Sequence, residues 1–74
     1  MEMTPSRVLR RLREGALATC AKINCADARV VEIAAAAGFD CIWLCNEHVP
    51  TDWLMLENMV RAAKLRGADA MVRV

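Results

Sequence analysis

The feature that most constrains this chain is a regular alternation of short apolar runs with amphipathic segments. The clearest apolar run extends from Cys41 to Cys45 and is apolar at every position, rather than at every second one. Strands that are covered on both faces have this pattern. Strands that alternate with helices pair in parallel through right-handed crossovers. The sequence therefore predicts an α/β fold.

Capping residues indicate where the helices begin. Thr4 precedes Pro5, so we expect the first helix to have Thr4 as its N-cap and Pro5 as its first residue. Asp27 is the expected cap of the second helix and Thr51 that of the third. The predicted elements are helix 4–14, strand 16–23, helix 27–37, strand 41–45, helix 52–66 and strand 70–74. The third helix is expected to bury a stripe made of Trp53, Leu56, Val60 and Ala63.

Two architectures begin with this order of elements. A doubly wound sheet usually has a glycine-rich phosphate turn after its first strand, and residues 24–27 contain no glycine. A (β/α)8 barrel needs about 250 residues, so three strands would form only its opening portion. The first helix would then fit as a plug across the barrel bottom. We therefore expect residues 1–74 to be a single incomplete TIM-barrel segment, an N-terminal helix plus parallel βαβαβ.

Composition limits the partners. The formal net charge is +1, so the arginines of helix 4–14 are interpreted as a solvated helix face and no nucleic-acid partner is expected. No secretory signal and no apolar run of about 18 residues is found, which predicts a cytoplasmic protein with no membrane partner. The four cysteines are expected to be reduced thiols. The hydrophobic fraction of 57% and the open strand edges favour a homo-oligomer.

Polar residues lie near the ends of two predicted strands, where a barrel places its active site. His48 follows strand 41–45, and its imidazole titrates near neutral pH, which suits proton transfer. Arg73 lies in the otherwise apolar strand 70–74, where a guanidinium suits a carboxylate or an enolate oxygen. Glu47 could orient His48 or contact metal-bound water. The alternatives are a solvated loop histidine and an arginine that only marks the end of its strand.

The cysteines could build a metal site or serve a structural role. Cys41 and Cys45 share one strand face and His48 follows, so a Cys/Cys/His cluster is conceivable. Two thiols four residues apart on an extended strand lie more than about 12 Å apart, too far to share one tetrahedral zinc. We therefore interpret both as core cysteines and expect no metal ligands in this chain.

Four segments in combination resemble the opening third of the HpcH/HpaI aldolase family. They are VEIAAAAGFD (31–40), WL (43–44), EHVPTDW (47–53) and VRV (72–74). The resemblance runs from about Gly15 to Val74 and implies a TIM barrel. It also implies a class II aldolase, a lyase that uses a divalent metal (Mg, Mn or Co) to cleave 4-hydroxy-2-oxo acids reversibly to pyruvate and an aldehyde.

The resemblance implies roles for individual residues. His48 would be the catalytic base or support it, and Arg73 would bind the pyruvate-type donor and stabilise its enolate. Glu47 and Cys45 would support them, although Cys45 stands where the family usually has an Asp, which would alter water activation. The family's metal ligands, a Glu and an Asp, come from later strands. We therefore expect the N-terminal part of an aldolase, inactive as an isolated 74-residue chain. The alternative is a non-catalytic, truncated or split half-barrel unit that acts only through oligomerisation.

Overall fold

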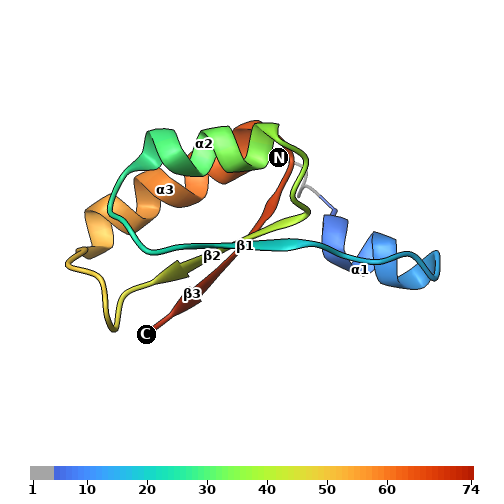
Figure 1. Cartoon of the computed structure of the whole chain (residues 1–74), viewed down its shortest axis with the longest axis horizontal. Helices are drawn as coiled ribbons and strands as arrows, with labels where there is room; N and C mark the ends of the chain where they lie inside the picture. The colour runs from blue at the N-terminus through green and yellow to red at the C-terminus, as the bar shows by residue number, and fades with distance from the viewer. Residues whose placement is uncertain (1–4) are drawn as a thin grey trace.

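A computed structural model describes residues 5–74 of the chain (Figure 1). The elements are α1 (Arg7–Arg13), β1 (Cys20–Ile23), α2 (Ala28–Ala36), β2 (Cys41–Cys45), α3 (Trp53–Leu65) and β3 (Asp69–Arg73). The three strands form one parallel sheet in the order β1-β2-β3. The expected α/β class, an N-terminal helix followed by parallel βαβαβ, is confirmed.

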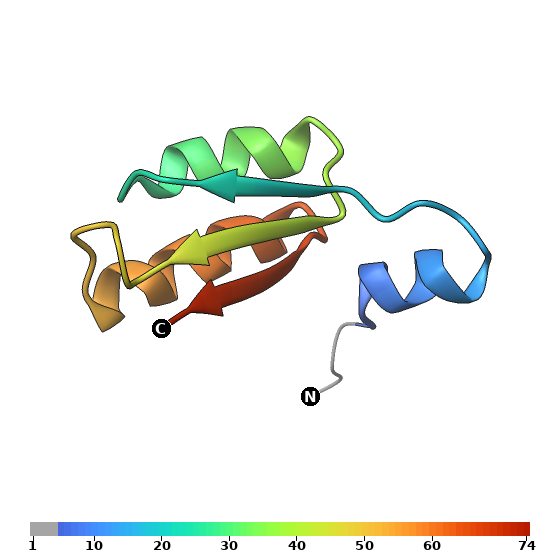
Figure 2. The ribbon, with the colours of Figure 1, turned by 60° about the horizontal axis from the view of Figure 1, so that its bottom comes forward.

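The core lies between the sheet and two helices. α2 and α3 pack side by side on the same face of the sheet (Figures 1 and 2). Ile42 and Leu44 of β2 point toward them and are fully buried against Val31 of α2 and Met59 of α3. Neighbouring strand residues point to opposite faces, so the even-numbered positions of β2 supply this core.

The other face of the sheet is covered by neither α2 nor α3. Trp43 lies on this face, and the Lys22 ammonium of β1 sits 4.9 Å from the centre of its ring. Met71 of β3 shares the face through its register with Trp43 and is half exposed. This open face is the side that a closed barrel would turn inward.

α1 lies at the edge where the strands begin, opposite the strand tips (Figure 2). Asp40, only 3% exposed, precedes β2 and holds α1 there. Its carboxylate accepts hydrogen bonds from Arg7 Nε at 2.7 Å, Arg11 Nε at 3.2 Å and the backbone N–H of Thr19 at 2.9 Å. Two of the arginines expected to be solvated therefore bind a buried carboxylate instead.

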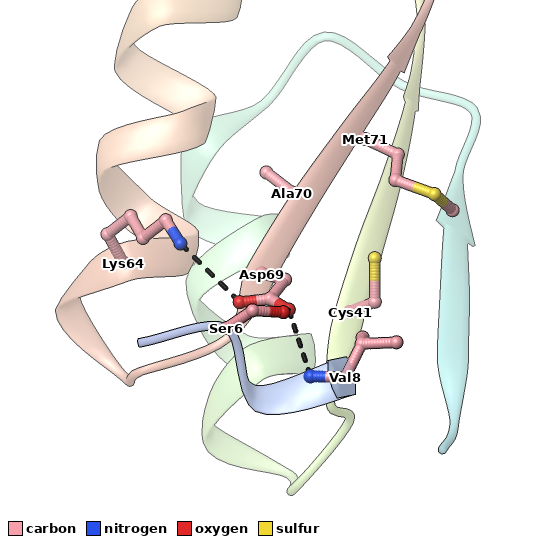
Figure 3. Close-up of a pocket in the computed structure, with 7 residues that line it drawn as sticks. All are labelled: Ser6, Val8, Cys41, Lys64, Asp69, Ala70 and Met71. Atoms are coloured by element: carbon pink, nitrogen blue, oxygen red, sulfur yellow. Dashed lines mark hydrogen bonds and ion pairs between the residues drawn. The ribbon is translucent and has the colours of Figure 1, made fainter. Parts of the chain in front are cut away.

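A second carboxylate, Asp69 of β3, binds the start of α1 (Figure 3). It accepts hydrogen bonds from the Ser6 hydroxyl at 2.7 Å and from the backbone N–H groups of Val8 at 2.9 Å and Arg7 at 3.2 Å. Lys64 Nζ lies 3.5 Å from Asp69 Oδ1. Ser6, Val8, Lys64 and Asp69 help to line an open cavity of about 380 Å³. Its polar groups already bind one another, so it belongs to the attachment of α1.

The predicted start of the first helix is wrong. Ser6 is the N-cap of α1, and its hydroxyl accepts a hydrogen bond from the backbone N–H of Leu9 at 3.2 Å. Pro5 lies before the helix rather than in it, and Thr4 lies outside the described residues. A serine two residues after the threonine offers the same cap chemistry, and its additional bond to the sheet favours the later start.

The third helix also begins differently from the prediction. Asp52, not Thr51, is the N-cap, because its carboxylate accepts from the backbone N–H of Met55 at 2.7 Å. The Thr51 hydroxyl donates instead to Asn46 Oδ1 at 2.7 Å. Trp53, expected in the buried stripe, is 69% exposed, because the first turn of α3 extends beyond the strand tips (Figure 1).

Strand pairing sets the remaining bounds. β2 occupies the expected range, whereas β1 begins at Cys20 rather than at residue 16 because its ladder starts where Cys20 faces Cys41. β3 begins one residue early because Asp69 also pairs with Cys41, and it ends at Arg73 rather than at residue 74. Asp27 caps α2 as predicted. Both longer helices end one residue early, and a glycine with positive φ follows the end of each, Gly38 and Gly67.

Candidate functional site

The candidate site lies where β2 and β3 end. Cys45 and Arg73 are register partners, so their side chains leave the sheet on the same face, the open one. The backbone N–H of Asn46 donates to the carbonyl oxygen of Arg73 at 2.7 Å and extends the pairing by one step. The loop after β2 is thereby anchored to the end of β3, and residues 47 and 48 lie beside Arg73.

Glu47 connects the two residues that the sequence singled out. Its Oε2 lies 2.6 Å from Arg73 Nε, and its Oε1 lies 3.7 Å from His48 Nε2. The side chains of His48, Arg73 and Glu47 are 62%, 48% and 44% exposed. A ligand can reach these exposed side chains. Exposed ion pairs also add little to stability, so displacing one costs little. Glu47 therefore lies beside both residues, and its closer contact is with Arg73.

Cys45 is part of the same cluster through direct contacts with His48. Its Sγ accepts the backbone N–H of His48 at 3.3 Å and lies 3.7 Å from the Nδ1 atom of that ring. The backbone N–H of His48 lowers the pKa of Cys45 to about 7, although burial opposes the shift. The N–H of Glu47 and the imidazole of His48 contribute to this lowered value. The sequence signal for this contact is a Cys-x-x-His spacing that begins at the last residue of β2.

Cys41 provides a contrast on the same strand. It is as buried as Cys45, and burial raises its pKa to about 11, with a further contribution from Cys20 beside it. All four cysteines are free thiols. Among residues 5–74, Cys45 is the one cysteine whose sulfur contacts a histidine.

The divalent metal implied by the family resemblance can be tested against these side chains. Within residues 5–74, no group of three or more His, Cys, Asp or Glu side chains is placed to hold a metal ion. Hard divalent cations prefer several oxygen ligands, and the carboxylate at this edge, Glu47, is already bound to Arg73. The described residues therefore do not form a site for such a metal, and they support no reaction step that uses one.

The arrangement nevertheless has a defined chemical capacity. Arg73 presents hydrogen-bond donors and a positive charge on the open face, where an anionic ligand can compete with Glu47 for its guanidinium. His48 offers a solvent-accessible imidazole that can accept or return a proton. An anion-binding group and a proton-transfer group thus lie on either side of one carboxylate.

Comparison with known proteins supports the architecture. No protein-family model matches the chain, and no curated protein matches its sequence. Among solved structures, a crystal structure of a variant of the citrate synthase SbnG is similar, with a TM-score of 0.84 and 28% identity. The similarity covers 90% of this chain and 30% of that one, so the chain spans less than a third of the length of this neighbour.

The fold is therefore the opening portion of a TIM-barrel-like structure, as the sequence predicted. At a coarse level, the chain resembles a segment of an aldolase or citrate synthase type of barrel enzyme. In residues 5–74, no helix has the length and apolar character needed to cross a membrane.

Proposed function

We propose that this chain is the N-terminal part of a class II aldolase of the HpcH/HpaI type, which cleaves 4-hydroxy-2-oxo acids to pyruvate and an aldehyde. One observation carries the proposal: His48 and Arg73 lie on either side of Glu47, at the strand ends where TIM barrels hold their active sites. The similarity to a segment of a barrel enzyme supports it.

In this proposal Arg73 binds the 2-oxo acid. The ligand carboxylate takes the place of Glu47 on the guanidinium, whose planar donors match two oxygen atoms. When the carbon–carbon bond breaks, negative charge moves onto the enolate oxygen of the pyruvate product. A fixed cation beside that oxygen stabilises the charge as it develops.

His48 moves the proton. Cleavage of a 4-hydroxy-2-oxo acid requires removal of the proton on the 4-hydroxyl group, and a neutral imidazole can accept it. Mg, Mn or Co remains an expectation from the resemblance, and its ligands would have to come from outside residues 5–74.

The first experiment measures binding of pyruvate to the 74-residue chain. In a ¹⁵N–¹H NMR titration, we expect pyruvate to shift the amides of residues 45–48 and 73. Arg73→Met should weaken this binding at least tenfold, since it removes a charge-assisted, bidentate contact of about 1.5–3 kcal/mol. Arg61→Met is the matched control, because Arg61 is also exposed and paired with a glutamate, but on α3.

Equal pyruvate binding by the wild-type and Arg73→Met proteins would contradict the proposal. We further expect no turnover of a 4-hydroxy-2-oxo acid by the 74-residue chain, with or without Mg, Mn or Co. Metal-dependent pyruvate release, measured with lactate dehydrogenase and NADH, would show that the chain needs no further residues.

A second reaction is favoured by the structural comparison. The similar structure is that of a citrate synthase variant, which favours a condensation that builds citrate as the second candidate reaction at this edge. Citrate and pyruvate can be compared in the NMR titration. Tighter binding of citrate at residues 45–48 and 73 would favour the condensation over the cleavage.

The non-catalytic alternative rests on the strand edges. Within residues 5–74, β1 and β3 each pair only with β2, so each keeps one edge without a strand partner. Such edges favour association with other strands. A defined homo-oligomer in size-exclusion chromatography with light scattering, together with no pyruvate binding, would favour this alternative.

A further inference from the structure

The loop after β2 places a thiol, an imidazole and a carboxylate in sequence. Cys45 Sγ lies 3.7 Å from His48 Nδ1, and His48 Nε2 lies 3.7 Å from Glu47 Oε1. We propose that Cys45 is a nucleophilic thiol, activated by His48, that forms reversible covalent adducts with small aldehydes. This reactivity requires neither a metal nor enolate chemistry.

The order of groups matches the logic of nucleophilic catalysis. A nucleophile contacts a base, and a third group lies on the far side of that base. Such contacts are often longer without a substrate, and 3.7 Å is a close approach for sulfur and nitrogen. The backbone N–H of His48, which Sγ accepts at 3.3 Å, also favours the thiolate.

Cys41 shows that burial does not explain this arrangement. Cys41 and Cys45 lie on the same strand, share one face, and are each 3% exposed. Burial raises the pKa of Cys41 to about 11, whereas that of Cys45 falls to about 7. The difference comes from the residues that follow Cys45, since their N–H groups and the imidazole face its sulfur.

The proposed step balances without an oxidant. The thiol proton passes from Cys45 to His48 Nδ1, and the thiolate attacks the carbonyl carbon of the aldehyde. A carbon–sulfur bond forms while the carbonyl π electrons move to oxygen, which takes the proton back from the imidazolium. The product is a hemithioacetal, and the reverse steps release the aldehyde.

A thiol of this kind has a measurable advantage near neutral pH. At pH 7, about half of a thiol with a pKa of 7 is thiolate, against about 3% of a free thiol with a pKa near 8.5. The more acidic thiolate is intrinsically about fivefold less nucleophilic, so the net gain in rate at equal access is about threefold. The 3% exposure of Cys45 lowers its absolute rate. The pH of half-maximal reaction is therefore a sharper readout than the rate alone.

The test measures alkylation of the full chain by iodoacetamide from pH 5 to 10, with each cysteine followed by peptide mass spectrometry. We expect Cys45 to react half-maximally near pH 7, below a free model thiol such as glutathione. In His48→Gln, which alters an exposed side chain, the midpoint should rise and the rate at pH 7 fall at least twofold. The exposed Cys25 is the internal control and should react equally in both proteins.

A second arm tests the aldehyde. Acetaldehyde should slow alkylation of Cys45 more than it slows alkylation of glutathione, and removal of acetaldehyde should restore the rate. A free-thiol midpoint for Cys45, a midpoint unaffected by His48→Gln, or no protection by acetaldehyde would each overturn the proposal. These assays contain no metal and no 2-oxo acid, so their outcome is independent of pyruvate binding at Arg73.

Discussion

The two ends of this sheet use the same kinds of residue in opposite ways. Where the strands begin, Asp40 is 3% exposed and bound by two arginines and by Thr19. Where the strands end, the Glu47 side chain is 44% exposed and makes one short contact, with Arg73. Both ends place a carboxylate beside arginine, but the carboxylate is buried only at the first end.

The enclosed end of the sheet has a structural role, whereas the exposed end carries the candidate site. At the first end the partners of each carboxylate come from α1 and the strand starts, so the charges attach a helix that has no buried residue of its own. At the second end, His48 and Arg73 remain accessible to a ligand. TIM barrels divide their work in the same way, with stability at the bottom and chemistry at the top.

The largest expected effect comes from Asp40→Asn. The substitution leaves the guanidinium groups of Arg7 and Arg11 facing an uncharged amide, and it removes two charge-assisted hydrogen bonds. We expect the midpoint of urea unfolding, followed by far-UV circular dichroism, to fall several times further than for Asp27→Asn. Asp27 is the matched control because asparagine caps a helix as well as aspartate does. Equal unfolding midpoints for Asp40→Asn and Asp27→Asn would mean that Asp40 contributes no more to stability than the cap residue Asp27.

Acid should destabilise the chain through the same residues. The backbone N–H of Thr19, with help from Arg7 and Arg11, lowers the pKa of Asp40 to about 2 from an ordinary 3.8. The unfolded state therefore takes up the proton first as the pH falls. This contribution to stability is complete above about pH 4 and is lost between about pH 4 and 2.

Asp69 adds to the acid sensitivity. Burial raises the pKa of Asp69, but the N–H of Val8, the Ser6 hydroxyl and the N–H of Arg7 outweigh it, and the net shift is downward. The measurement is the urea midpoint at pH 5, 4, 3 and 2. Asp40→Asn should flatten its decline, and a wild-type midpoint that holds steady down to pH 2 would contradict the assignment.

Local signals in the sequence were enough to predict the order of elements but not all of their bounds. The apolar run of β2 and the Asp27 cap correspond directly to the structure, because both depend on nearby residues. The starts of β1 and β3 depend on the partner strand instead. Trp53 was misplaced because helical periodicity shows which residues share a face but not how far the sheet extends beneath them.

The candidate site was predictable in its residues but not in its contacts. Parallel strand ends meet at one edge, so the proximity of His48 and Arg73 followed from topology. The pairing of Glu47 with Arg73 rather than with His48 depends on how the loop turns back over the sheet. The contact between Cys45 and His48 depends on the same turn, which no periodicity in the sequence encodes.

The smallest expected effect on stability comes from Glu47→Gln, at the open end. Glu47 pairs with Arg73 while half exposed, and such pairs contribute about 0.2–1 kcal/mol, so the unfolding free energy should change by less than about 1 kcal/mol. Glu57→Gln is the matched control, because it breaks a pair with Arg61 on α3 that is exposed as well. Pyruvate should bind more tightly to Glu47→Gln, since the competing carboxylate is gone, whereas Glu57→Gln should bind it as the wild type does. A loss of stability as large as that of Asp40→Asn would show that both ends of the sheet are structural and would remove the contrast between them.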